Sequence, residues 1–191
     1  MSKMKALLLI VATVFLLVAG SGATAVAATT SVVQPAQNHD VYLKLDGVCG
    51  EAKAAKFANW IQLTGVDFGV TNSSSGAPTG GGSGAGKAKM DPFTVSKTYD
   101  CSSVPILTNS LSGKHIKSGE IDFVTRGEKP FTVLKVVMTD VMISDYQFSN
   151  MKETLTFSFG AIDFSYYAMD SGGKSKLPVQ GGFDFKTGSV K

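Results

Sequence analysis

Two glycine-rich stretches come close to motifs that bind phosphate or carry a catalytic serine. Residues 81–88 spell GGSGAGKA, so an alanine stands where a phosphate-binding loop needs the Ser or Thr that holds magnesium. A strand is expected to follow, so no helix N-terminus would face a phosphate. Ser171-Gly-Gly-Lys174 and Lys186-Thr-Gly188 match two β-lactamase elements, but no third element lies between them. We interpret these stretches as turns, loops and a strand end.

Residues suited to metal binding or acid–base catalysis are few and scattered. His39 and His115 are the only histidines, and neither has another His, Cys or paired carboxylate at metal-ligand spacing. No pair of acidic residues is placed by the sequence for acid–base catalysis. Trp60, Tyr166 and Tyr167 offer either an aromatic platform for sugar or ordinary core packing, and packing is favoured. The sequence therefore predicts no catalytic residue, cofactor or metal, and a binder or building block rather than an enzyme.

The two cysteines, Cys49 and Cys101, are a candidate disulfide. In an oxidising compartment the bond would close a loop of about fifty residues and add about 4 kcal/mol in the chain-entropy model. The alternative is two unpaired thiols in separate loops. Unpaired exposed thiols are a liability after export, so the sequence favours the disulfide.

The chain begins with a stretch typical of a secretory signal peptide. A positive n-region and an apolar run over residues 6–19 precede small residues, with cleavage frames ending at Ala25 and Ala27. The alternative is an uncleaved anchor, because residues 6–28 are long enough to span a membrane. Small residues in the second half favour cleavage. We therefore assign residues 1–27 to a signal peptide and predict export to the periplasm or the extracellular space.

One domain of ordinary size remains after cleavage. About 164 residues are left, enough for a proper core, and we divide them into a flexible lead-in at residues 28–39 and a domain at residues 40–188. The chain has 18 basic and 15 acidic residues. Lys3 and Lys5 lie in the leader, so the mature chain has 16 basic and 15 acidic residues. A near-neutral domain without a basic cluster argues against nucleic-acid binding. No membrane contact is expected once the leader is removed.

Residues 131–168 organise the domain. Two segments rich in Val, Ile, Phe, Tyr and Thr flank a polar break at Ser149-Asn150, which predicts an antiparallel hairpin. In the second segment the apolar positions change parity at Gly160, which requires a bulge or a sharp bend. The segment at residues 60–70 changes parity in the same way at Gly65. Strands that change faces midway are typical of a small closed barrel.

The first segment of the hairpin is apolar on both faces between residues 131 and 146. One face is expected to line the barrel core, and the other to be covered by a helix or another subunit. Further strand patterns occupy residues 40–46, 87–99, 116–125 and 180–186. Residues 47–59 form a long excursion in which a helical turn is possible, and residues 71–86 and 171–176 are expected to be a loop and a turn.

Residues 102–111 are the only good helix candidate. Ser102 or Ser103 can cap its start, and Gly113 fits a left-handed stop. Three of its apolar residues share one face: Val104, Leu107 and Leu111. The predicted fold is mainly all-β, a closed β-barrel of two antiparallel sheets with one short flanking α-helix.

Several short motifs in order resemble the Hcp family, the hemolysin-coregulated proteins that form the inner tube of bacterial type VI secretion systems. The resemblance spans residues 40–186. Its motifs are Asp46-Gly-Val-x-Gly-Glu51, Phe68-Gly-Val70, Gly84-Ala-Gly-Lys87, Asp91-x-Phe-Thr-x-Ser-Lys97, Ser112-Gly-Lys-His-Ile116 and Gly181-Gly-Phe-Asp184.

The resemblance implies a structural protein without catalytic residues. Its copies would form hexameric rings that stack head to tail into a tube, with sheath, spike and effector proteins as partners. It also implies that residues 47–59 are a candidate region for ring contacts. The leader departs from the family pattern, because tube subunits assemble in the cytoplasm. Either the start is misassigned, or the chain is exported as an Hcp-like ring or as a monomeric binding module of the envelope or extracellular space.

Overall fold

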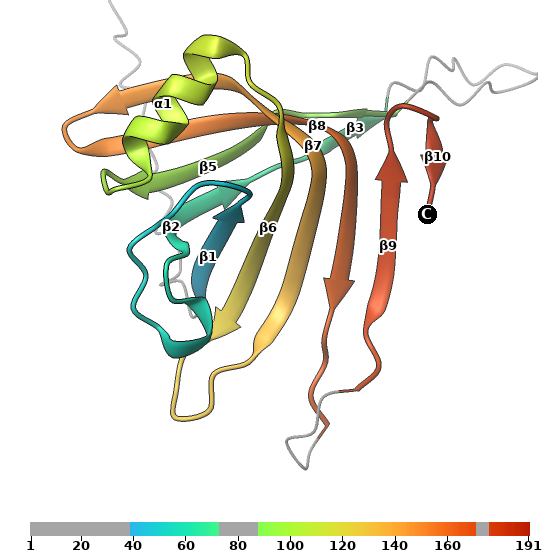
Figure 1. Cartoon of the computed structure of the whole chain (residues 1–191). Helices are drawn as coiled ribbons and strands as arrows, with labels where there is room; N and C mark the ends of the chain where they lie inside the picture. Colours follow the sequence, from blue (N-terminus) through green and yellow to red (C-terminus); the bar gives the residue numbers. More distant parts are fainter. Residues whose placement is uncertain (1–38, 73–87, 171–175) are drawn as a thin grey trace, which may run out of the picture. The chain divides into compact units, whose positions relative to one another are not determined.

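A long antiparallel hairpin forms the middle of the fold (Figure 1). Its strands are β7 (Thr132–Ser149) and β8 (Lys152–Tyr166), and Asn150 and Met151 turn the chain between them with positive φ angles of 48° and 62°. The computed structural model describes residues 39–72, 88–170 and 176–191, all within one compact unit. The hairpin predicted from the sequence is thereby confirmed, with its turn at the predicted polar break.

Six strands close into a barrel in the order β8-β5-β2-β1-β6-β7, because β7 pairs again with β8. The neighbouring pairs are antiparallel. The remaining barrel strands are β1 (His39–Leu45), β2 (Ile61–Asp67), β5 (Phe93–Thr98) and β6 (Ile116–Thr125). Outside the barrel lie the sheet extension β9 (Val179–Asp184) and β10 (Ser189–Val190), the pair β3 (Val70–Asn72) and β4 (Ala88–Met90), the helix α1 (Ser103–Ser112) and the 3-10 turn η1 (Ala55–Phe57). The predicted all-β barrel with a flanking helix is confirmed.

The described residues hold ten strands, where the sequence suggested about seven. The expected strand at residues 60–70 is interrupted at Phe68-Gly69, and the one at residues 87–99 at Asp91-Pro92. Proline lacks the N–H that a ladder needs, which explains the second interruption. The short β10, which the sequence did not suggest, is the third additional strand. The leader, the lead-in up to residue 38, the glycine-rich stretch at 73–87 and residues 171–175 lie outside the described part, in which no helix is long and apolar enough to cross a membrane.

The barrel corner predicted at Gly160 exists, but the bulge lies on the opposite strand. β8 pairs with β5 up to Phe157 and with β9 from Ala161 onward, so its partner changes around Gly160. The register shift of the hairpin falls in β7, between Ile143 and Asp145. Asp140, which faces Gly160, has a positive φ of 56°. The extra residue of β7 thus lies opposite Thr156 and Phe157, a few residues from Gly160, and at the corner itself the unusual backbone is that of Asp140.

At Gly65 the bulge occurs in the predicted strand itself. The register of β2 against β5 shifts between Leu63 and Gly65. An extra residue at this point turns the following side chains to the other face, as the parity change required.

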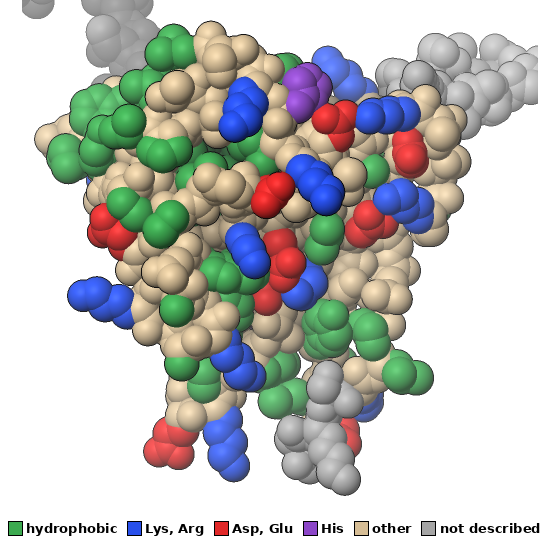
Figure 2. All heavy atoms as spheres, viewed as in Figure 1, with side chains coloured by type: hydrophobic (Ala, Val, Ile, Leu, Met, Phe, Trp, Pro, Cys, Tyr) green, Lys and Arg blue, Asp and Glu red, His purple; other side chains and the backbone are tan. Residues whose placement is uncertain are grey.

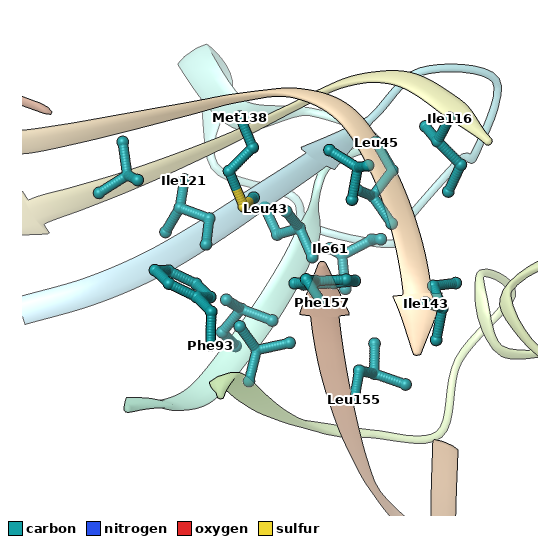
Figure 3. Close-up of a cluster of buried hydrophobic side chains, with 14 of the residues drawn as sticks. Leu43, Leu45, Ile61, Phe93, Ile116, Ile121, Met138, Ile143, Leu155 and Phe157 are labelled. Atoms are coloured by element: carbon teal, nitrogen blue, oxygen red, sulfur yellow. The ribbon is translucent and has the colours of Figure 1, made fainter. Parts of the chain in front are cut away.

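The core fills the barrel with aliphatic and aromatic side chains from alternate strand positions (Figure 3). Burying each of these side chains contributes about 1.5–3 kcal/mol, so the cluster is the main stabilising element of the fold. Ten of its members are labelled in the figure: Leu43, Leu45, Ile61, Phe93, Ile116, Ile121, Met138, Ile143, Leu155 and Phe157.

The excursion at residues 47–59 packs a smaller cluster on the outer face of β1. Its single turn, η1, places Phe57 in a stacked contact with Tyr42, with 4.5 Å between the ring centroids. Trp60 meets Phe57 edge to face. The possible helical turn in this excursion is confirmed as one 3-10 turn.

Glycine is required in β9 where the strand passes close to β8. A Cβ on Gly182 would lie 2.6 Å from the carbonyl oxygen of Ile162, whereas a Cβ on Gly181 would meet nothing within 4 Å. We expect Gly182→Ala to lower the free energy of unfolding by about 1–3 kcal/mol, because backbone has to move. The matched control Gly181→Ala should stay within about 1 kcal/mol of the wild type. Urea denaturation of both variants checks this, and equal stabilities would contradict it.

Candidate functional site

A buried cluster of charged and polar side chains joins the helix to the barrel. Lys97 on β5 and Glu153 on β8 are directly opposite each other, form an ion pair, and are each only 1% exposed. The hydroxyl of Ser103, from the first turn of α1, accepts a hydrogen bond from Lys97 Nζ at 2.9 Å and donates one to Glu153 Oε2 at 2.6 Å. The cluster therefore fixes the start of α1 against two barrel strands.

Two further side chains complete the hydrogen bonding of this cluster. Asp100 Oδ1 lies 2.9 Å from Lys97 Nζ, and the Asp100 backbone N–H donates to Ser103 Oγ at 3.0 Å. Tyr146 on β7 donates its hydroxyl to Glu153 Oε1. Burial and this carboxylate raise the pKa of Tyr146 above its ordinary value. A buried polar network that is satisfied in this way rigidifies its surroundings.

The cluster is an anchor and not a catalytic site. A serine beside a lysine and a glutamate has the composition of a nucleophile with its base. A nucleophile must also reach a substrate, and Lys97, Ser103 and Glu153 are each 1% exposed or less. The arrangement can therefore hold the helix, but it cannot meet a substrate.

The helix itself turns an apolar face to solvent. Val104 is 60% exposed and Leu111 81%, while the buried residues of α1 are Ser103 and Ile106. In Figure 2 hydrophobic side chains gather over α1 at the upper left. The predicted shared face of Val104, Leu107 and Leu111, named here the helix patch, thus does not pack on the barrel, because the helix is anchored through Ser103 on its other side.

A second exposed apolar surface lies across the fold from the helix. Tyr166 on β8 pairs with Val179 on β9, and both are more than half exposed, as is Leu177 just before β9. These three residues form the edge patch. α1 and β9 lie at opposite sides of Figure 1, so the two patches belong to different faces of the domain. Groups of exposed large apolar side chains are candidates for interaction sites.

The helix is also capped differently from the prediction. Ser102 occupies the N-cap position of α1, but its side chain makes no capping bond, and the hydroxyl of Ser103 bonds to Lys97 and Glu153 instead, so neither serine caps the helix with its side chain. Asp100 Oδ1 instead accepts the Ser102 backbone N–H at 2.9 Å. At the other end Gly113 adopts the predicted left-handed conformation, with φ of 62°, and its N–H reaches the carbonyls of Asn109 and Ser110.

Charged side chains of both signs cover the outer face between the two patches (Figure 2). Lys135 on β7 pairs with Glu120 and lies 3.7 Å from Asp122 on β6. Burial raises the pKa of Asp122, although Lys135 and a hydrogen bond from Thr132 oppose the shift. Alternating charges of this kind are not the basic stripe of a nucleic-acid-binding face.

Asp140, at the barrel corner, contacts a lysine and a histidine. Lys186 Nζ lies 2.6 Å and His115 Nδ1 2.7 Å from its carboxylate oxygens. The hydrogen bonds from these two side chains lower the pKa of Asp140. The His115 ring is thus hydrogen-bonded to Asp140 at the surface, and the described residues hold no group of three or more potential metal ligands.

The aromatic residues considered for a sugar platform are not brought together. Trp60 packs against Phe57 beside β1, whereas Tyr166 lies on β8, which β6 and β7 separate from β1 on this side of the barrel. His39 begins β1. The stretch Lys186-Thr-Gly188 forms a tight turn whose first two N–H groups bond to Asp184 Oδ1.

The family is decided by a sequence match over most of the chain. Residues 42–166 match the family described as "Type VI secretion system effector, Hcp". The chain belongs to the Hcp family. This is a family of secreted structural proteins and not of enzymes.

Solved structures agree with this Hcp assignment. A structure titled as a type six secretion system protein has a TM-score of 0.74 and 28% identity, covering 80% of this chain and 99% of its own. A type VI secretion system effector from Yersinia pestis has a TM-score of 0.60 and 27% identity, covering 76% and 99%. Hcp1 from Salmonella typhimurium, at 24% identity, a TM-score of 0.64 and coverages of 81% and 99%, supports the fold. No curated protein matches the chain.

The buried cluster of this Hcp-family chain was not predicted, although the alternation of its strands carries a signal for it. Phe93, Val95 and Lys97 occupy alternate positions of one strand, so a lysine takes the place of a core residue. Glu153 likewise shares parity with the buried Leu155 and Phe157. One inward lysine and one inward glutamate in two strands of a small barrel indicate a buried pair, since neither is stable inside alone.

Proposed function

We propose that this Hcp-family chain is a self-assembling structural subunit whose copies form hexameric rings that stack into a type VI secretion tube. The observation that carries the proposal is the pair of exposed apolar patches on different elements, α1 and the β8–β9 edge. The chain has no catalytic role in this proposal, in line with its family.

The position of the two patches suits a ring. In a cyclic ring of more than two subunits each contact is head to tail, so every subunit needs two different, complementary surfaces. The helix patch and the edge patch lie on opposite sides of the domain, with mixed charges between them (Figure 2). Charged residues are depleted at interface cores and tolerated at rims. The helix patch of one subunit would therefore meet the edge patch of the next.

The proposed tube determines which partners we expect for the chain. We expect further copies of the chain above and below each ring, effector proteins in the lumen, and sheath and spike proteins of the same machine. Neither nucleic acid nor membrane is a partner in this proposal. The predicted leader would export the mature chain, so its rings would form in the periplasm or the extracellular space and not in the cytoplasm, where tube subunits of the family assemble.

A monomeric binding module of the envelope or the extracellular space is the second candidate, and one cavity favours it. The cavity measures about 300 Å³, within the range of small-ligand sites. Its lining is almost entirely apolar and includes Phe68, Phe164, Phe183 and Phe185.

The native mass of the purified mature chain separates the two functions. Light scattering on a size-exclusion peak, with electron micrographs of the same fraction, should give six subunits in a ring with a central hole. A single subunit at every concentration, together with stabilisation by an apolar ligand, would instead support the binding module.

A further inference from the structure

Two thiols that are far apart in the sequence meet at one end of the barrel. Cys49 lies in the turn after β1, and Cys101 lies between β5 and α1. Cys101 Sγ is 3.2 Å from the carbonyl oxygen of Cys49. Both residues are exposed, and both are free thiols in this structure. The fold thus brings together the two cysteines of the disulfide predicted from the sequence.

The backbone on each side of the pair is already fixed. The Cys101 N–H donates to Glu51 Oε1 at 2.9 Å, which ties the segment before α1 to the excursion. Inside the excursion, the Gly50 N–H bonds to the Asn59 carbonyl at 2.8 Å, and Val48 forms a bridge with Leu45. A disulfide needs its two Cα atoms close together, and pre-ordered segments meet this need with little strain.

The two thiols also interact with each other. Partial desolvation and the hydrogen bond with the Cys49 side chain raise the pKa of Cys101 to about 11. Two neighbouring cysteines can form a disulfide or supply two ligands of a metal site. A metal site would need a third ligand, and the described residues contain no such group of three.

We propose that Cys49 and Cys101 form an intramolecular disulfide under oxidising conditions, which staples the excursion at residues 47–59 to the start of α1. The oxidant is a disulfide such as oxidised glutathione. One thiolate attacks it and releases one reduced glutathione, and the second cysteine then displaces the other. The protein loses two protons and two electrons in total, and the oxidant takes them up as two thiols.

The staple closes next to the buried cluster. Asp100 precedes Cys101 directly and contacts both Lys97 and Ser103, so the same short segment carries the cluster and the covalent bond. Oxidation would therefore restrain the start of α1, which carries the helix patch, as well as the excursion at residues 47–59. The inference does not depend on ring formation, because both cysteines belong to one subunit.

The reduced full-length mature chain, treated with oxidised glutathione, tests the proposal. We expect the monomer mass to fall by about 2 Da, and a peptide containing both cysteines to appear in a non-reducing digest. The melting temperature should rise on the order of 10 °C above that of the reduced protein. The variants Cys49→Ser and Cys101→Ser should show no such rise on oxidation.

Three outcomes would overturn it. These are two titratable thiols after oxidation, covalent dimers in place of the internal bond, and equal melting temperatures of the oxidised and reduced forms. The melting temperature and the free thiols can be measured on isolated subunits as well as on rings. A failure of the disulfide proposal therefore does not change what the native-mass experiment says about ring formation.

Discussion

Replacing Glu153 with alanine should lower the free energy of unfolding by about 3–5 kcal/mol. The change removes the carboxylate that pairs with Lys97 and accepts hydrogen bonds from Ser103 and Tyr146. Lys97 is 1% exposed and would keep a buried positive charge, with only Asp100 as counter-ion. Thermal and urea denaturation at neutral pH measure the loss.

A paired replacement separates the ion pair from simple burial. In Lys97→Met combined with Glu153→Leu both charges are gone and the volumes are nearly kept, so the loss should be much smaller than for Glu153→Ala alone. Glu128→Ala, in the exposed turn between β6 and β7, should change the stability by less than about 0.5 kcal/mol. A double variant as unstable as the single one would show that the cluster acts through packing and not through its charges.

The barrel could be predicted because its information is local. Period-two alternation places Val41, Leu43 and Leu45 inward, and all three are buried in the structure. The parity changes at Gly65 and Gly160 predicted where strands bend, since a side chain cannot change faces without a bend or an extra residue. These observations need no knowledge of which strands become neighbours.

The buried cluster could not be derived in the same way, because it depends on pairing. Lys97 and Glu153 are separated by 56 positions and meet only when β5 lies beside β8. Alternation predicts that each faces inward, but the partner of each is set by the closed barrel. The extra residue in the β7–β8 hairpin is a similar case, because either paired strand could have carried it.

The helix shows how tertiary contact overrides an amphipathic pattern. Three apolar residues on one face usually indicate the side that packs. Here the polar Ser103 and the single Ile106 are buried instead, because the ion pair of β5 and β8 offers a strong anchor for a hydroxyl. An apolar helix face left outside is then evidence for assembly and not for internal packing.

A single charge in either patch should abolish the ring. Leu111 is 81% and Leu177 93% exposed in the isolated domain, so glutamate at either position costs little in folding. In a ring the same charge would be buried without a partner, at a cost of several kcal/mol for each contact. We expect Leu111→Glu and Leu177→Glu each to shift the native mass from six subunits to one, with a melting temperature close to that of the dissociated wild type. Lys117→Glu, on the exposed surface of β6, is the control for added negative charge and should leave the ring intact.

Mixing the two variants tests whether the helix patch and the edge patch meet each other. Leu111→Glu keeps a normal edge patch, and Leu177→Glu keeps a normal helix patch, so one productive contact is possible between them. A head-to-tail interface then predicts that the equimolar mixture forms dimers and stops there, because the outer patches of each dimer are both charged. If each variant alone is monomeric but the mixture remains monomeric too, the patches belong to two separate interfaces. If both variants still form six-membered rings, neither patch lies in the ring contact, and the exposed apolar residues must serve another surface of the tube.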